Sequence, residues 1–150
     1  MNFVTVPLVA GILGTIAMTL LLYLPSWLGW RTLNVVRPIG TLVLHDHNRE
    51  RALLPGLVVH FVVGIFFAYL YLAIFYTLNL PLSALKGAQL GCFHGAVVAF
   101  LVRFVLLEHH PLERYHDDEV RGRFTSFALV IAHVIYGLIV GKLLQVSNLW

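Results

Sequence analysis

The chain has 150 residues, of which 59% are hydrophobic and 11% are charged, and its mean hydropathy is +0.86. A soluble domain is typically about 45–50% apolar and about 25% charged, and a soluble chain of this length could not bury so much apolar surface. The composition therefore excludes an ordinary soluble domain and a disordered chain, and the single cysteine, Cys92, excludes a disulfide scaffold. The formal charge of +3 does not indicate nucleic-acid binding, because the basic residues flank apolar runs as they do in membrane proteins.

Four apolar stretches are long enough to cross about 30 Å of hydrocarbon, which takes about 20 helical residues. They cover residues 3–24, 53–78, 84–107 and 124–144. Each stretch must be helical, because lipid offers no hydrogen-bonding partner to free backbone groups. The sequence therefore predicts an all-α, polytopic membrane protein in which four transmembrane helices form a single domain in contact with the lipid bilayer.

The segment that follows the first stretch, residues 25–44, is more than a linker. Trp27 and Trp30 fit the aromatic belt of a membrane interface. Its second half is mostly apolar, but Arg37 and Pro38 interrupt it, and it is too short to span. We expect an interfacial or shallow re-entrant segment.

Charge asymmetry predicts the orientation. The basic residues of the two loops on one side are Arg31, Arg37, Arg49, Arg51, Arg114, Arg121 and Arg123. The opposite side has only Lys86 and Lys142 near helix ends. Under the positive-inside rule the Arg-rich loops are cytoplasmic, so both termini are expected to face out.

The second and fourth stretches share a spacing. Residues 60–68 and 133–141 both read H-x-x-x-G-x-x-x-small. Residues four apart lie on one helix face, and small ones let two helices approach closely. The pattern indicates either a duplicated two-helix hairpin or a small-residue stripe that two membrane helices share by chance.

Four pieces of the sequence, RPIGTLV, GLVVHFVVGIFFAYLY, GAQLGCFHG and HVIYGLIVG, resemble segments of small four-helix bacterial inner-membrane proteins. Those families are mainly uncharacterised. The resemblance implies a multi-pass protein of the bacterial inner membrane, and it brings no activity and no functional residue with it.

Three histidines lie inside the predicted spans, where a polar side chain is a functional candidate by default. At 1.5 Å per residue, His60 lies about 10 Å and His133 about 13 Å from the inner boundary, whereas His94 lies about 20 Å from it. His60 and His133 are therefore predicted to share a depth that His94 does not share.

Matched imidazoles on two helices are the axial ligands of a b-type haem. His60 and His133 are the candidate ligands, Gly64 and Gly137 would make room for the macrocycle, and Arg103 would contact a propionate. The alternatives are that the histidines form interhelical hydrogen bonds, that they line a small-molecule or proton pathway, and that Arg103 only extends to the interface.

A second group of metal-ligand types lies in the inner loops. Imidazoles and carboxylates there could bind zinc, iron or copper, although their spacing matches no strong pattern. The candidates are His45, His47, Glu108, His109, His110 and His116. The alternatives are a solvated polar loop and a pH-sensing histidine cluster.

No catalytic signature occurs in the sequence, such as a nucleophile elbow or a P-loop. The first functional hypothesis is therefore a non-catalytic subunit or scaffold that packs within a larger membrane complex or a homo-oligomer. The second is electron transfer through haem b, and the third is a small-molecule or proton pathway.

Overall fold

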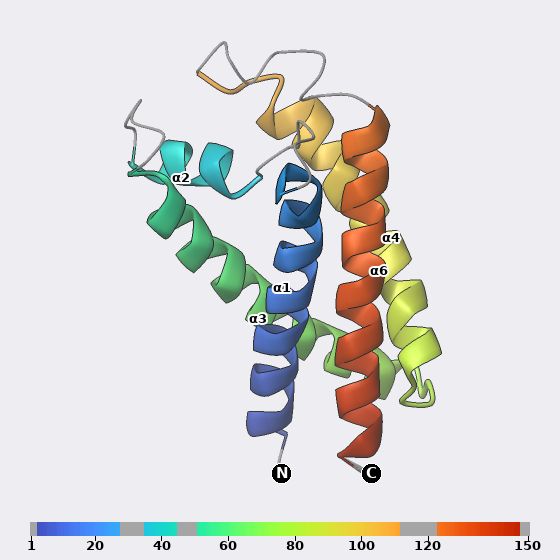
Figure 1. Ribbon diagram of the computed structural model, residues 1–150. Coiled ribbons are helices and arrows are strands. Elements are labelled where there is room, and N and C mark those ends of the chain that lie inside the picture. The colour runs from blue at the N-terminus through green and yellow to red at the C-terminus, as the bar shows by residue number, and fades with distance from the viewer. Residues whose placement is uncertain (1–2, 28–34, 45–50, 112–122, 148–150) are drawn as a thin grey trace.

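The computed structural model describes residues 3–27, 35–44, 51–111 and 123–147, and the regular structure within these ranges is helical (Figure 1). The elements are α1 (Thr5–Trp27), α2 (Val36–Leu44), α3 (Leu53–Thr77), α4 (Ala84–Leu101), the π-helical turn η1 (Val102–Leu106) and α6 (Arg123–Val146). Four of the helical stretches are long and apolar enough to cross a membrane: Thr5–Leu24, Leu53–Thr77, Ala84–Leu106 and Thr125–Val146. The all-α fold with four membrane spans is confirmed.

The ends of the spans follow from local chemistry. After α3, Asn79 adopts a left-handed conformation with φ 48°, which asparagine tolerates better than most residues and which reverses the chain. Ser83 then caps α4, because its side chain accepts a hydrogen bond from the Lys86 amide at 3.2 Å. At the other end of this span, the Leu107 amide bonds to the Val102 carbonyl at 2.9 Å and closes the wider turn of η1.

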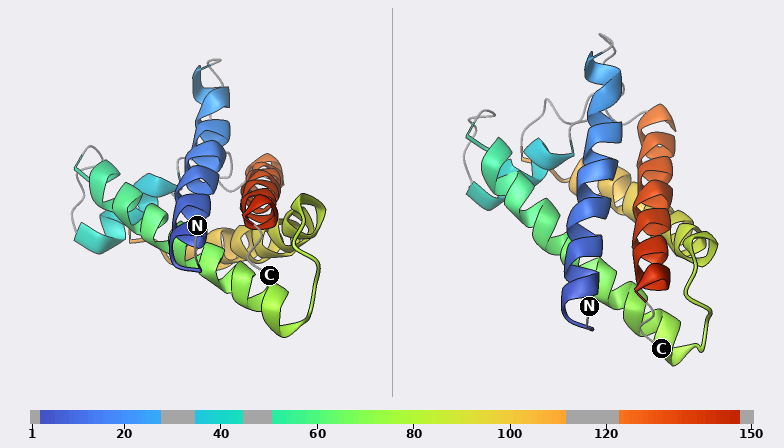
Figure 2. Two further views of the ribbon diagram at one scale, coloured as in Figure 1. Left: turned by 90° about the horizontal axis from the view of Figure 1, so that it is seen from below. Right: turned by 60° about the horizontal axis from the view of Figure 1, so that its bottom comes forward.

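The helices pack mainly through four pairwise contacts, and side chains of α3 also meet those of α4. α2 contacts α3, α3 contacts α1, α1 contacts α6, and α6 contacts α4. Figures 1 and 2 show α3 running obliquely across α1, while α4 is inclined against the more upright α6. The first residue of α1 and the last of α6 lie at one end of the molecule, and α2 lies at the opposite end (Figure 1).

Glycines hold α4 and α6 in backbone contact. A methyl group added to Gly87 or to Gly137 would overlap the other residue's carbonyl oxygen, and one added to Gly91 would overlap the carbonyl of His133. The small-residue stripes therefore serve to pack helices inside the chain, as one interpretation of the sequence predicted.

The outward faces are strongly apolar. Phe66, Phe93 and Phe127 are each more than 60% exposed, as side chains in contact with lipid would be. The short helix α2 occupies part of the predicted interfacial segment and packs on the start of α3, where Gly40 and Gly56 allow close backbone contact. α1 continues beyond the predicted end of the first span, and Trp30 lies outside the described residues.

Candidate functional site

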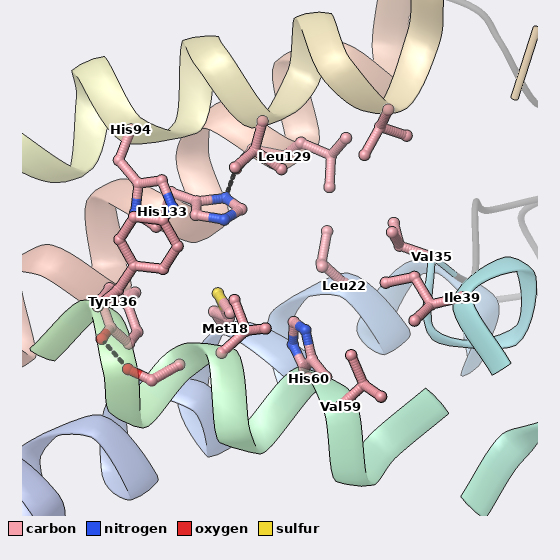
Figure 3. A pocket seen from close by; sticks show the side chains of 15 residues that line it. Met18, Leu22, Val35, Ile39, Val59, His60, His94, Leu129, His133 and Tyr136 are labelled. Atoms are coloured by element: carbon pink, nitrogen blue, oxygen red, sulfur yellow. Dashed lines mark hydrogen bonds between the residues drawn. The ribbon is translucent and has the colours of Figure 1, made fainter. Parts of the chain in front are cut away.

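An internal cavity of about 130 Å³ lies among the four membrane helices and α2 (Figure 3). Most of its walls are aliphatic side chains. The residues that line it are Met18, Leu22, Val35, Ile39, Val59, His60, Val63, Gly64, Phe67, His94, Val98, Val102, Leu129, His133 and Tyr136. The cavity is therefore apolar except for three imidazole rings and one phenol.

The three intramembrane histidines come from three different helices and meet at this one cavity. The rings of His94 and His133 are in contact, with centroids 4.7 Å apart and planes at 74°. The prediction that His94 lies at a different depth from His133 is therefore wrong. The inclination of α4 explains the error, because a tilted helix gains less depth per residue than an upright one (Figure 1).

His94 is held on both sides. Its ring stacks on Phe67 of α3 at 3.8 Å between centroids, with planes 25° apart. Its Nδ1 lies 3.3 Å from the hydroxyl of Tyr71, also on α3. His94 thus connects α3 to the close pair formed by α4 and α6. In the sequence, the signal for His94 is its position next to Gly95. Gly95 belongs to the stripe of Gly87, Gly91 and Gly95 that packs α4 on α6.

His133 is fixed by its own helix. Its Nδ1 lies 2.7 Å from the Leu129 carbonyl, one turn earlier in α6. The side chain is 5% exposed, and Gly95 lies so close that an added methyl group would be 2.8 Å from the His133 Cβ. Figure 3 shows the ring at the wall of the cavity with its second nitrogen turned inward.

His60 lies across the cavity from the other two histidines, on α3 (Figure 3). Its Nε2 is buried and has no hydrogen-bond partner among the residues that the structure describes. An unsatisfied buried polar group typically costs about 1–3 kcal/mol, so this nitrogen requires an explanation. A bound molecule that fills the cavity would supply one.

The glycines predicted to make room for a haem do not leave such room. Gly64 lines the cavity, but the space beside it is taken by the hydroxyl of Thr15, and its carbonyl accepts a hydrogen bond from Tyr136. Gly137 faces Gly87 of α4 instead of the cavity. Helix packing thus uses both of these glycines in this arrangement.

The cavity is also too small for a haem. Sites for drug-sized molecules are about 300–1,000 Å³, well above the 130 Å³ found here, and Met18 and Leu22 project into the space beside His60 (Figure 3). Arg103, the predicted propionate partner, is absent from the cavity wall, and its guanidinium carbon lies 5.3 Å from the ring centroid of Phe104. The residues do not fit a b-type haem in this arrangement.

The predicted metal cluster of the inner loops is only partly within the described residues. His45, His47 and His116 lie outside them. Among the residues that are described, no three histidine, cysteine or carboxylate side chains are grouped as a metal ion would require. Glu108 and His109 are exposed.

His110, the remaining member of that predicted cluster, is 2% exposed and has a structural contact that the sequence did not indicate. Its Nε2 lies 3.0 Å from the Thr41 hydroxyl and 3.2 Å from the Pro38 carbonyl. His110 therefore ties the end of the third span to α2, whose Ile39 lines the cavity.

A family model described as a family of unknown function, DUF6789, matches residues 1–148. No curated protein and no solved structure shows a significant match to the chain. The match agrees with the resemblance of the sequence to uncharacterised membrane proteins. Because it covers nearly the whole chain, this four-span membrane protein belongs to the DUF6789 family.

Proposed function

We propose that this protein binds a small, neutral and largely apolar molecule inside the membrane, in the cavity between its helices. The observation that supports the proposal is the convergence of His60, His94 and His133 on one otherwise apolar cavity, with the Nε2 of His60 buried and unpartnered within the described chain. Among the hypotheses drawn from the sequence, this corresponds to the small-molecule pathway.

Size and polarity define the molecule. Apolar cavities of about 150 Å³ stay dry and bind benzene-sized molecules, and this cavity of about 130 Å³ is close to that size. No charged side chain lines it among the described residues. A charged ligand would lose its hydration without compensation, so a neutral one is expected.

The hypothesis of a non-catalytic subunit or scaffold stays a prediction. Small-residue stripes can also pack against a partner or a second copy of the chain. The glycines of α4 and the H-x-x-x-G stripe of α6 contact one another within the chain, so they no longer argue for an external partner.

The proposal can be tested with para-fluorotoluene, a benzene-sized apolar probe observed by fluorine NMR, and the full chain in detergent micelles. Val98 lines the cavity and its neighbour Val97 is 42% exposed on the outer face of the same helix. Val98→Phe would place a ring in the cavity, whereas Val97→Phe would place the same ring in the surrounding detergent.

We expect saturable binding to the wild type and to Val97→Phe, and loss of that binding in Val98→Phe. If the probe bound the three proteins equally, it would be associating with the micelle or the outer surface, and the proposal would be wrong.

We also infer that the Arg-rich loops face the cytoplasm of a bacterial cell. The inference rests on the charge asymmetry of the loops. Replacing Cys92 with serine and Asn48 with cysteine leaves one thiol in the first loop. A membrane-impermeant maleimide should fail to label it in whole cells and should label it after lysis. Labelling from outside would reverse the orientation.

A further inference from the structure

The cavity has a polar end and an apolar end. His94 and His133 meet at one end, while Val35 and Ile39, from the region of α2, close the other (Figure 3). α2 lies at one end of the molecule (Figure 1), and His94 and His133 lie within the third and fourth membrane spans. The polar end of the cavity is thus the deeper one. A phospholipid anchored at the interface would place its polar headgroup at the shallow end, next to Val35 and Ile39, so this geometry favours a compact molecule with its polar group at the deep end.

The hydrogen bond of His133 determines its tautomer. A backbone carbonyl oxygen only accepts hydrogen bonds, so the Nδ1 that lies 2.7 Å from the Leu129 carbonyl must carry the proton. In the neutral imidazole the other nitrogen, Nε2, is then an acceptor with a free lone pair. Figure 3 shows this nitrogen turned toward the cavity. The polar end of the cavity therefore presents an acceptor, and a matching ligand must present a donor.

The walls at this end are aromatic. The rings of Phe67, His94, His133 and Tyr136 all line the cavity, and His94 already packs face-to-face with Phe67. Aromatic rings pack best on other aromatic rings in stacked or edge-on arrangements. An aromatic ligand can therefore pack on these walls in a stacked or edge-on arrangement.

We propose that the ligand is a compact aromatic molecule of the phenol class, whose ring fills the cavity and whose hydroxyl donates a hydrogen bond to Nε2 of His133. This inference rests on the proposed function and specifies its ligand. His60 lies on the opposite wall, where its Nε2 is buried and has no partner among the described residues.

The test compares para-fluorophenol with para-fluorotoluene, which differ in a hydroxyl and a methyl group of similar size. Fluorine NMR titrations use the full chain in micelles, after correction for partition of each probe into empty micelles. A hydrogen bond contributes about 1 kcal/mol, so the dissociation constant should be about five- to tenfold lower for the phenol.

His133→Phe should abolish this preference while retaining para-fluorotoluene binding. His109→Phe makes the same replacement at an exposed position outside the cavity and should keep the preference.

A second measurement needs no substitution and therefore no assumption about folding of the variant. Nitrogen NMR of the wild type with labelled histidine should show a protonated Nδ1 and an unprotonated Nε2 in His133. The phenol should shift the Nε2 resonance, and the toluene should leave it in place.

The outcomes separate the two proposals. Equal affinity for both probes, or a protonated Nε2 in His133, would overturn the phenol assignment while leaving the cavity a binding site. Absence of saturable binding for both probes would overturn the proposed function itself.

Discussion

The two long-helix pairs of this protein, α1 with α3 and α4 with α6, carry the same H-x-x-x-G spacing and use its glycine differently. In the second pair, Gly137 lies against the backbone of Gly87, so two helices meet without an intervening side chain. In the first pair, Gly64 faces the side chain of Thr15. A backbone contact allows no adjustment, whereas a threonine can rotate, so the same spacing gives a rigid contact at Gly137 and an adjustable one at Gly64, even though Gly11 of α1 lies against the backbone of α3 at Ile65.

The histidines of the two pairs also differ in whether their ring nitrogens have hydrogen-bond partners within the chain. His133 has a hydrogen bond to its own helix and a ring contact with His94. His60 lines the cavity from α3 with a buried nitrogen that has no partner among the described residues. The repeated motif therefore specifies close approach of helices, while the local contacts of each histidine decide whether its ring nitrogens have partners within the chain.

The largest effect is expected where the rigid contact is broken. Gly137→Ala should lower the free energy of unfolding by about 3 kcal/mol, because the new methyl group meets the carbonyl of Gly87, which is part of a helix backbone. Gly64→Ala should cost only about 1 kcal/mol, because it meets the movable hydroxyl of Thr15. Unfolding by a denaturing detergent in mixed micelles measures both values.

Thr15→Ala provides the control for this pair of variants. Combined with Gly64→Ala it removes the hydroxyl that causes the overlap, so the double variant should be more stable than Gly64→Ala alone. Equal costs for the two glycine variants, with no rescue by Thr15→Ala, would show that the two contacts do not differ in rigidity.

Substitution of His133 and of His60 should change the free energy of unfolding in opposite directions. His133→Ala removes a buried ring that packs on His94 and should destabilise by about 2 kcal/mol. His60→Leu replaces an unsatisfied buried nitrogen with an apolar group and should be neutral or stabilising by about 1 kcal/mol in the absence of ligand. The same unfolding measurement applies. Comparable losses in both variants would mean that His60 is satisfied in the folded protein.

Span positions could be predicted from the sequence, because the thickness of hydrocarbon and the cost of free backbone groups allow few alternatives. The depths of individual residues within the spans could not be predicted. The expectation for His94 failed because residue counting treats helices as upright, and the inclination of α4 is set by glycine contacts with α6 that only the folded chain displays.

The candidate ligand-binding residues could also be predicted only in part from the sequence. His60 and His133 could be selected from the sequence because polar residues are rare in membrane spans. Gly137 and Arg103 were assigned to a haem because their positions along the helix allowed it, but the direction in which a residue faces depends on the partner helix. Gly137 faces α4, and Arg103 lies away from the cavity wall.

A smaller effect is expected at the contact that joins the end of the third span to α2. His110→Ala removes its hydrogen bonds to Thr41 and Pro38 and should cost about 1.5 kcal/mol, with the loss concentrated in α2. Hydrogen exchange followed by mass spectrometry should show faster exchange over residues 36–44. The exposed neighbour His109, changed to alanine, should leave that exchange unaltered. Uniform acceleration over all helices would indicate a global role for His110 instead.

The smallest effect concerns the turn that connects the two helix pairs. Asn79 is the one non-glycine residue with positive φ in the described chain, at 48°, and it lies outside both helix contacts. Asn79→Ala should cost about 1 kcal/mol, because alanine lacks the side chain that makes this conformation tolerable, whereas Asn79→Gly should be nearly neutral.

Neither change at Asn79 should alter binding of para-fluorotoluene, because the packing of each helix pair is set by its own facing residues and the turn only connects the two pairs. Unfolding and fluorine NMR on the two variants measure both quantities. Loss of probe binding in Asn79→Gly would show that the connection between the pairs, rather than the residue facing each glycine, keeps the cavity open.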